Sequence, residues 1–563
     1  MSQEIIISLS LIIGLAAILT IVARIIKQPP IIAYLIAGIL AGPLMFGILH
    51  SDVASSQIIQ TFAHIGVAFL LFIVGLSLDL KVLKELGSIS ALAGIGGIII
   101  TGCIGFLIAI GLGFQNLSAL YLAIALAFSS TVLVIKIFSD KNEMDTLHAR
   151  ISLGILIVQD FVAALALMIM PVIRQGSFNT IIFQISKILG LVIVIFAFSA
   201  LFVKKFLHYL ASNQEVLFLS GVAWALIISN LFHYLGLSIE IGALIAGMSL
   251  ASSRYTLELG GKIKPLRDFF IIMFFVFFGS QLAAPITKTL LIQAGIFSLF
   301  VLLGKPIITM TLMKFLGYKK RTNFLTGASL AQISEFSLIL VLVGFTLGHL
   351  PQEIMSLTVL IAITTIAISS YNIYYSNSIF NKISRVLFMF ESKKIREEKK
   401  PEQVYDIILF GYNRTGYSLL KTLIRQNHKF IVVDYDPRII MHLSQQGINC
   451  VYGDASDKEF VEEIKLTEAK MVISTIPDIQ SNLTIRDRLK EVHSKAIFIA
   501  TAEQIQEALD LYKEGADYVI VPHILGGDYA SKLVEKFKTT PIKYKILKRE
   551  HIKDLEKRQK EHD

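Results

Sequence analysis

Long apolar segments recur through the first two thirds of the chain, from residue 4 to residue 376. Each is long enough to cross, or nearly cross, a hydrocarbon core of about 30 Å as a helix. From Lys382 to Asp563 the pattern changes to short apolar runs between charged residues. We predict a polytopic α-helical membrane domain of about thirteen spans, at 4–26, 30–48, 57–78, 88–113, 118–138, 147–172, 179–203, 215–234, 236–252, 265–285, 288–316, 322–346 and 353–376.

Composition supports this division. The chain has 563 residues, of which 54% are hydrophobic, and this is too apolar for a protein that is soluble throughout. The net charge of +10 comes in large part from short loops between the spans, so nucleic-acid binding is not expected. The only two cysteines, Cys103 and Cys450, offer neither a disulfide framework nor a metal-binding motif.

Basic residues predict the orientation in the membrane. One set of alternate loops contains only Arg174 and Lys288, whereas the other set contains Arg24, Lys27, Lys81, Lys84, Lys141, Arg150, Lys204, Lys205, Arg254, Lys262, Lys264, Arg267, Lys314, Lys319, Lys320 and Arg321. Loops rich in Lys and Arg stay in the cytoplasm. We therefore expect a bacterial inner (plasma) membrane protein with its N-terminus outside and its C-terminal domain in the cytoplasm.

Two predicted spans contain polar groups that indicate interrupted helices. The fifth span includes Ser129, Ser130 and Thr131, and the twelfth includes several hydroxyls between Ala328 and Leu340. Transporters built from inverted repeats have interrupted helices at corresponding places in their two halves, and the interruptions free backbone groups near the midplane. The pattern is consistent with one repeat in the first six spans and another in the last six.

A carboxylate, Asp160, lies in the middle of the apolar sixth span. An ionisable residue at this depth is typical of an ion or proton pathway, where a proton and a small metal cation can compete for the same oxygen atoms. The alternative is that Asp160 only bonds to a neighbouring helix, since inserting one Asp costs only about 2.5–3.5 kcal/mol.

Other polar side chains can complete a cation site around Asp160. The hydroxyls of Ser129, Ser130 and Thr131 lie one span earlier, and Gln159 adds an amide oxygen or fixes the carboxylate rotamer. With released backbone carbonyls they would form an oxygen-rich shell for K⁺ or Na⁺. Hydroxyls in membrane helices commonly bond to a carbonyl one turn back, so the cluster alone is weak evidence.

Lys305 is a second charge inside a predicted span, directly before Pro306. A buried ammonium needs a carboxylate or carbonyl partner, or it becomes neutral. We expect Glu335 on the next span to be this partner, with Asp160 in the cation-free state as the alternative. Snorkelling of Lys305 to an interface is less favoured, because apolar residues precede it in the span.

The membrane region resembles the monovalent cation:proton antiporter-2 family, and within it the Kef-type potassium:proton exchangers. The motifs that carry this resemblance are Pro30 to Pro43, Gly66 to Leu76, Gln159-Asp160, Gly242 to Gly247 and Gln332 to Phe336. The resemblance implies an NhaA-type inverted-repeat fold of thirteen helices, a homodimer, an elevator-like alternating-access cycle, and Asp160 as the ion- and proton-carrying carboxylate. It associates the Gln-Asp pair with potassium, and one titrating carboxylate suggests one cation exchanged for one proton.

The C-terminal region begins with the pattern of a dinucleotide-binding fold. A strand-like run leads directly into the turn from Gly411 to Gly416, and a second strand ends in Asp434. Phosphates bind at such strand-to-helix turns, and an acid at this spacing fits a ribose. Asn413 replaces the middle glycine, but strand–helix alternation continues to the run 518–521.

This region resembles the nucleotide-binding regulator of potassium conductance, also called the KTN or TrkA-N domain (the RCK N-lobe). The resemblance implies that Gly411, Gly416, Asp434 and Asp454 contact a bound adenine nucleotide, with Arg414 near its phosphates. The ligand would be AMP, ATP or NAD(H), and the side chain of Asn413 favours a mononucleotide by narrowing the pyrophosphate space. The alternative is an α/β Rossmann-like domain with an empty site.

We therefore expect a transmembrane cation:proton exchanger domain at 1–380, a charged linker at 381–403, a nucleotide-binding regulatory domain at 404–535 and a charged tail at 536–563, helical or disordered. The predicted function is K⁺/H⁺ antiport of the K⁺ efflux type, gated by the nucleotide, with Na⁺/H⁺ antiport as the alternative. Expected partners are a second copy of the chain, membrane lipid and an ancillary regulatory subunit.

Two other classes of protein fit less well. A regulator-gated cation channel would need a Thr-Val-Gly-Tyr-Gly filter or a similar ring of carbonyls, and the sequence has none. A membrane-anchored NAD-dependent dehydrogenase would need a substrate domain and a catalytic His or Lys constellation beside the Rossmann unit. We therefore expect a transporter and not an enzyme.

Overall fold

The computed structural model divides the chain into two compact units, Met1–Ser392 and Lys393–Asp563, which we describe separately. It describes all residues except 1, 48–52, 78–86, 142, 145, 171–185, 187–189, 200, 202–213, 236–238, 252, 254–255, 283–285, 393–403, 414, 436, 454, 456–459, 462–463, 465, 539–540 and 563.

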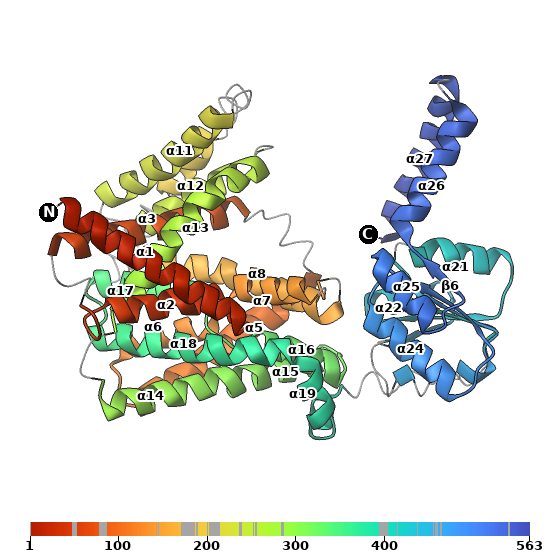
Figure 1. Ribbon diagram of the computed structural model, residues 1–563, viewed down its shortest axis with the longest axis horizontal. Coiled ribbons are helices and arrows are strands. Elements are labelled where there is room, and N and C mark those ends of the chain that lie inside the picture. The colour runs from red at the N-terminus through yellow and green to blue at the C-terminus, as the bar shows by residue number, and fades with distance from the viewer. Residues whose placement is uncertain are drawn as a thin grey trace. The chain divides into compact units, whose positions relative to one another are not determined.

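The first unit is built from helices (Figure 1). Their bounds are α1 Ser2–Ile25, α2 Pro30–Ala41, α3 Val53–Ser77, α5 Gly87–Gly111, α6 Asn116–Ala127, α7 Thr131–Asp140, α8 Leu147–Ile169, α11 Gln214–Tyr234, α12 Ile239–Leu250, α13 Thr256–Ser280, α14 Lys288–Leu299, η3 Phe300–Gly304, α15 Lys305–Phe315, α16 Lys320–Ser329, α17 Glu335–Thr346, α18 Gln352–Tyr374, α19 Ser376–Ile383 and η4 Val386–Phe390.

Within the described residues, eight helical stretches are long and apolar enough to cross a membrane, and α2, α12 and α17 are shorter apolar helices. Most of the seventh predicted span, 179–203, lies outside the described residues. The membrane character of the first unit is therefore clear, while the count of thirteen spans stays a prediction.

Both predicted helix interruptions are present. The helix α6 ends at Ala127 and α7 begins at Thr131, whereas α16 ends at Ser329 and α17 begins at Glu335. In each case a serine starts the second half-helix, because its hydroxyl accepts a hydrogen bond from a free backbone N–H of the first turn. The sequence pattern of hydroxyls inside apolar spans thus predicted the breaks correctly.

Small residues let membrane helices approach closely. The helices α3 and α12 pack side by side, with Gly75 against Gly247. A Cβ atom at Gly75 would lie 2.3 Å from the carbonyl oxygen of Leu244, and one at Gly247 would lie 2.1 Å from that of Phe72. Such contacts between backbones are the usual way in which membrane helices associate, since lipid supplies no hydrophobic drive.

The last part of the first unit packs against the helices that follow the π-helical turn η3. Phe380 of α19 and Leu387 of η4 are buried together with Met310 of α15. Residues 381–392, predicted as part of the linker, therefore belong to the first unit, and residues 393–403 lie outside the described residues.

Hydrogen bonds attach the same segment to α15 and α16. The Lys314 Nζ donates to the Met389 carbonyl oxygen at 2.7 Å, and the Asn323 Nδ2 donates to the Phe390 carbonyl oxygen at 2.8 Å. Asn323 is fully buried. The chain leading to the second unit is thus fixed to two helices of the membrane unit.

The loop between α7 and α8 is connected to α19. Asn377 donates from Nδ2 to Glu143 Oε1 at 3.2 Å, and Lys141 forms a salt bridge with the same oxygen at 2.8 Å. Burial opposes ionisation of Glu143, but hydrogen bonds from His148 and Lys141 outweigh it and hold the pKa of the carboxyl below its ordinary value. The loop is therefore held to α19 through Glu143, which contacts Lys141, His148 and Asn377.

The second unit is a parallel sheet with helices on both faces. Its strands are β1 Ile407–Phe410, β2 Phe430–Asp434, β3 Cys450–Tyr452, β4 Met471–Ser474, β5 Ile497–Thr501 and β6 Tyr518–Ile520, and its helices are α21 Thr415–Arg425, α22 Pro437–Gln445, η5 Leu466–Glu468, α24 Ile479–Glu491, α25 Ile505–Lys513, α26 Pro522–Phe537 and α27 Pro541–His562. All pairings are parallel, in the order β3-β2-β1-β4-β5-β6. This is the strand order of the Rossmann fold.

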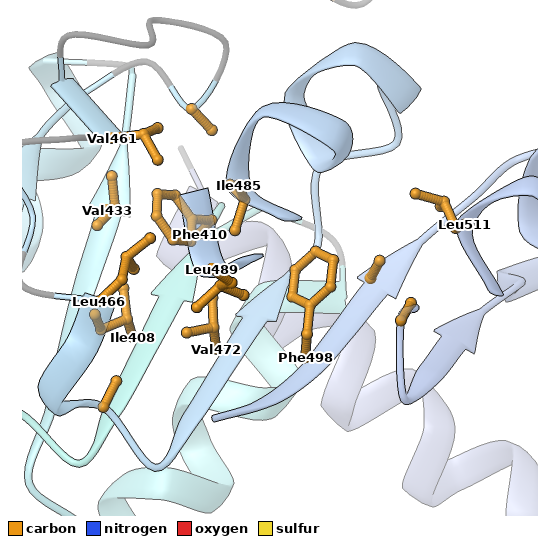
Figure 2. Close-up of a cluster of buried hydrophobic side chains, with 14 of the residues drawn as sticks. Ile408, Phe410, Val433, Val461, Leu466, Val472, Ile485, Leu489, Phe498 and Leu511 are labelled. Carbon is orange, nitrogen blue, oxygen red and sulfur yellow. The ribbon is translucent and has the colours of Figure 1, made fainter. Parts of the chain in front are cut away.

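Alternation along the strands fills a core on each face of this sheet. Phe410, Val472 and Phe498 point to one face, where Ile485 and Leu489 of α24 cover them (Figure 2). The intervening strand residues pack on the opposite face against α21 and α22, in a cluster that includes Leu409, Val432, Leu420 and Leu443. The two cores fix the sheet edge at which the predicted nucleotide-binding residues lie.

Candidate ion and nucleotide sites

Asp160 lies in the middle of α8, beside the start of α7. The Thr131 Oγ1 donates a hydrogen bond to Asp160 Oδ2 at 2.8 Å, and Asp160 is half-buried. Thr131 is the first residue of α7, so the carboxyl group faces the positive end of that helix dipole. The geometry brings together the predicted carboxylate and one predicted hydroxyl.

The two helix interruptions are connected to each other next to this carboxyl group. The Gln159 Oε1 accepts a hydrogen bond from the Ser129 backbone N–H at 3.1 Å. The Ser129 Oγ donates to the carbonyl oxygen of Leu330, in the other break, at 3.0 Å. Gln159 and Ser129 therefore hold the backbone of the site in position, and both are buried.

Lys305 has two backbone partners, one in each break. Its ammonium donates to the Phe128 carbonyl oxygen at 2.7 Å and to the Gln332 carbonyl oxygen at 2.9 Å. The side chain is only 2% exposed, so these charge-assisted bonds replace lost solvation. The expectation of a carboxylate partner, either Glu335 or Asp160, gives way to this arrangement, because the free carbonyls at two half-helix ends lie closer.

Ser130 and Glu335 complete the group of predicted residues. Ser130 accepts a hydrogen bond from the Leu133 backbone N–H at 3.3 Å and so caps α7. Glu335 is the first residue of α17, and it is 8% exposed. The helix α17 that it begins packs against α8, which carries Asp160.

Opposite electrostatic ends meet at this crossing. The positive ends of α7 and α17 face the carboxyl groups of Asp160 and Glu335, whereas the Lys305 ammonium binds a carbonyl where α6 ends and another just after α16. Carboxyl, hydroxyl and carbonyl oxygens therefore gather here, and among the described residues at the two breaks the Lys305 ammonium is taken up by backbone carbonyls. Such a set of oxygens suits an alkali cation.

Sequence reasoning missed the backbone partners in the second break. Leu330 and Gln332 contribute carbonyl oxygens, and the Gln332 side chain donates from Nε2 to the Ser329 carbonyl at 3.0 Å while it accepts from the Ser369 hydroxyl. The polar Gln332 inside an apolar span was the available signal, but a backbone carbonyl acceptor cannot be read from side-chain identity.

The predicted nucleotide site lies at the carboxyl ends of the central strands. Gly411 follows β1 with φ +86°, and the Thr475 hydroxyl after β4 donates to its carbonyl oxygen at 3.0 Å. A Cβ atom at Gly416 would lie 2.2 Å from the same carbonyl oxygen, so glycine is needed there. Asp434, at the end of β2, accepts a hydrogen bond from the Tyr412 backbone N–H at 2.8 Å.

The structure brings only part of the predicted nucleotide set together. Gly411, Gly416 and Asp434 share one edge of the sheet, between the two halves of the strand order, where ligands of this fold bind. Asn413 is exposed in the turn, and Arg414 and Asp454 lie outside the described residues. Thr475 was not predicted, and its position after β4 was the signal.

Comparison with known proteins agrees with both units. The sodium/hydrogen exchanger, transmembrane family matches residues 11–373, and the TrkA-N domain family matches residues 407–522. The putative cation/proton antiporter YbaL of Escherichia coli (strain K12) is 28% identical over 94% of this chain and 96% of its own length.

Two further proteins are similar to the chain. The glutathione-regulated potassium-efflux system protein KefC of Escherichia coli O17:K52:H18 is 27% identical over 90% of this chain and 80% of its own. The solved structure of the sodium proton antiporter MjNhaP1 from Methanocaldococcus jannaschii is 16% identical, covers 69% of this chain and 99% of that chain, and has a TM-score of 0.49. From the match over residues 11–373, the chain belongs to the sodium/hydrogen exchanger transmembrane family, and a TrkA-N domain follows its membrane unit.

Proposed function

We propose that this cation/proton antiporter is a transporter, not an enzyme, and exchanges K⁺ for H⁺ at Asp160. The observation that carries the proposal is the contact of Asp160 with Thr131 at the start of a half-helix, where a carboxyl group can hold a cation. The Gln159-Asp160 pair and the potassium-efflux name of the KefC relatives support K⁺, and Na⁺ is the alternative.

The proposed cycle uses one carboxyl group for two cargoes. With a cation bound, Asp160 is ionised and is stabilised by the Thr131 hydroxyl and the positive end of α7. When the cation leaves, a proton takes its place, because an unpaired carboxylate at membrane depth is costly. Lys305 keeps its two carbonyl contacts and stabilises the backbone in both states.

The proposal is tested with the purified protein in proteoliposomes that contain a pH-sensitive dye. Addition of K⁺ should move protons in the wild type, with a larger response to K⁺ than to Na⁺. Asp160→Asn should give no dye response to either ion, because an amide side chain neither takes up nor releases a proton near neutral pH. The control is Glu240→Gln, which alters a buried acid on α12 that lies outside the site. Equal activity of Asp160→Asn would remove the carrier role.

We also propose that an adenine nucleotide at the TrkA-N unit gates exchange. The close approach at Gly411 and Gly416 and the acid at Asp434 support a phosphate and ribose site, with AMP or ATP favoured over NAD(H). A ligand shifts transport only if it binds the permissive and blocked states with different affinity. The segment fixed to Lys314 and Asn323 supplies a covalent route from that unit to the membrane helices.

Calorimetry on the full chain in detergent tests the nucleotide site. Asp434→Ala should abolish binding of AMP, ATP and NADH, because the ribose loses its acceptor and the Tyr412 N–H loses its partner. The matched control is Asp406→Ala, at the opposite end of β1, where the carboxylate pairs with Lys470 in solvent. Unaltered affinity in Asp434→Ala would refute the placement.

The resemblance to Kef-type exchangers extends the proposal to assembly. We propose a homodimer in a bacterial inner membrane, with the N-terminus outside, the TrkA-N unit in the cytoplasm and an ancillary regulatory subunit as a further partner. The many basic residues in one set of alternate loops support this orientation.

A further inference from the structure

Glu335 is a buried carboxyl group whose contacts leave one of its oxygens unused. It begins α17 at the second helix break and is 8% exposed. Its Oε2 is buried and, within the part of the chain the structure describes, has no hydrogen-bond partner. A buried polar atom in this state costs free energy, so its presence calls for an explanation.

Structural roles do not account for this oxygen. The obvious partner would be Lys305, but that ammonium is directed to the carbonyl oxygens of Phe128 and Gln332. Capping of α17 is performed by Ser334, whose hydroxyl accepts from the Phe336 backbone N–H at 3.1 Å. Neither the cap of α17 nor the Lys305 ammonium therefore uses the Glu335 Oε2 atom.

The surroundings of Glu335 are those of the ion site. The helix α17 that Glu335 begins packs against α8, which carries Asp160. The two breaks are joined beside it by the Ser129 hydroxyl, which donates to the Leu330 carbonyl oxygen at 3.0 Å. The positive charge of Arg267 on α13 acts on Glu335, although the Arg267 guanidinium is hydrogen-bonded to Asp268 at 2.6 Å. Two neighbouring carboxylates repel each other, and the repulsion is relieved when a proton or a cation binds between them.

We propose that Glu335 is a second carboxylate ligand of the transported cation, so that the ion binds between Asp160 on α8 and Glu335 at the start of α17. This deepens the proposed function and rests on it. Each carboxyl group lies at the positive end of a different half-helix, which gives the two halves of the inverted repeat one ligand each. Two anionic ligands also make the distance between them a determinant of which alkali cation fits.

Glu335→Gln and Glu335→Asp in the proteoliposome assay separate a ligand from a structural residue. Glu335→Gln should raise the half-saturating K⁺ concentration about tenfold, equivalent to about 1.4 kcal/mol, while the maximal rate stays near that of the wild type. Glu335→Asp keeps the charge but withdraws it by one methylene group. It should restore most of the affinity and change the ratio of half-saturating K⁺ to Na⁺.

Two control variants test whether the effect of Glu335→Gln is specific to a ligand of the cation. Glu240→Gln removes a buried charge near His64, away from the ion site, and should leave half-saturation unchanged. Arg267→Gln should also leave it unchanged, and if it reproduced the Glu335→Gln result, Glu335 would act through Arg267 and the proposal would fall. Asp160→Asn in the same series reports separately on the proposed function.

The outcomes are distinguishable. A loss of maximal rate in Glu335→Gln with half-saturation unchanged would overturn the ligand role, while a silent Asp160→Asn would still uphold the carrier. If Glu335→Gln does not fold, the decision passes to Glu335→Asp, where an unchanged ratio of K⁺ to Na⁺ half-saturation overturns the proposal. The proposal is supported if the half-saturating K⁺ concentration rises in both variants and rises more in Glu335→Gln than in Glu335→Asp.

Discussion

The two interrupted helices solve the same electrostatic problem with different residues. In the first, between α6 and α7, the carboxyl group comes from a neighbouring helix, since Asp160 is joined to the break by Thr131. In the second, between α16 and α17, the carboxyl group belongs to the break itself, as Glu335. On the side of the free backbone carbonyls the two breaks are alike, because the Lys305 ammonium donates to one carbonyl oxygen in each.

This comparison shows which parts of the site the backbone dictates and which it leaves open. A broken helix always exposes carbonyl oxygens on one side and N–H groups on the other, so each break needs a positive and a negative partner. One lysine supplies the positive partner for both breaks. The negative partners can come from any neighbouring element, and they differ here.

The largest effect is expected from removing the shared partner. Lys305→Met leaves two buried carbonyl oxygens without a donor, at about 1–3 kcal/mol each, so we expect a loss of about 2–6 kcal/mol in the free energy of unfolding. Denaturant titration in mixed micelles measures it. Lys288→Met, an exposed lysine at the start of α14, should change stability by about 0.5 kcal/mol or less. A Lys305→Met protein as stable as the control would show that the two carbonyls find other donors.

A smaller effect distinguishes the two breaks from each other. Ser130→Ala and Ser334→Ala each remove one cap from a half-helix and should each cost about 0.5–2 kcal/mol in the free energy of unfolding. At the second break the Ser337 hydroxyl also accepts from the Ser334 backbone N–H at 3.3 Å, and Ser334→Ala keeps this bond, so we expect the cost of Ser334→Ala to lie at the lower end. The same titration compares them, and stability retained in only one variant would mean that the breaks are not equivalent.

Much of this arrangement could be predicted from the sequence, because local chemistry determines it. Hydroxyls inside apolar spans indicated both breaks, and Ser129, Thr131, Gln159 and Asp160 lie together as expected. The partners of Lys305 could not be predicted, since the choice between Glu335 and a backbone carbonyl depends on distances that only the packed helices determine.

The TrkA-N unit shows the same limit. The close approach of the backbone at Gly411 and Gly416 follows from a turn with glycines after a buried strand, and this turn and the Rossmann-like alternation were predicted, whereas the order of the strands was not. The contribution of Thr475 was not, because it comes from a strand that is distant in sequence and adjacent only in the sheet.

Lys305 and Ser129 have one more mechanical consequence. The Lys305 ammonium donates to the backbone of both interrupted helices, and Ser129 adds a hydrogen bond to Leu330. Neither interrupted helix can therefore slide past the other without breaking a charge-assisted hydrogen bond. Any movement that carries the cation from one face of the bilayer to the other therefore has to move the two joined breaks together as one rigid body.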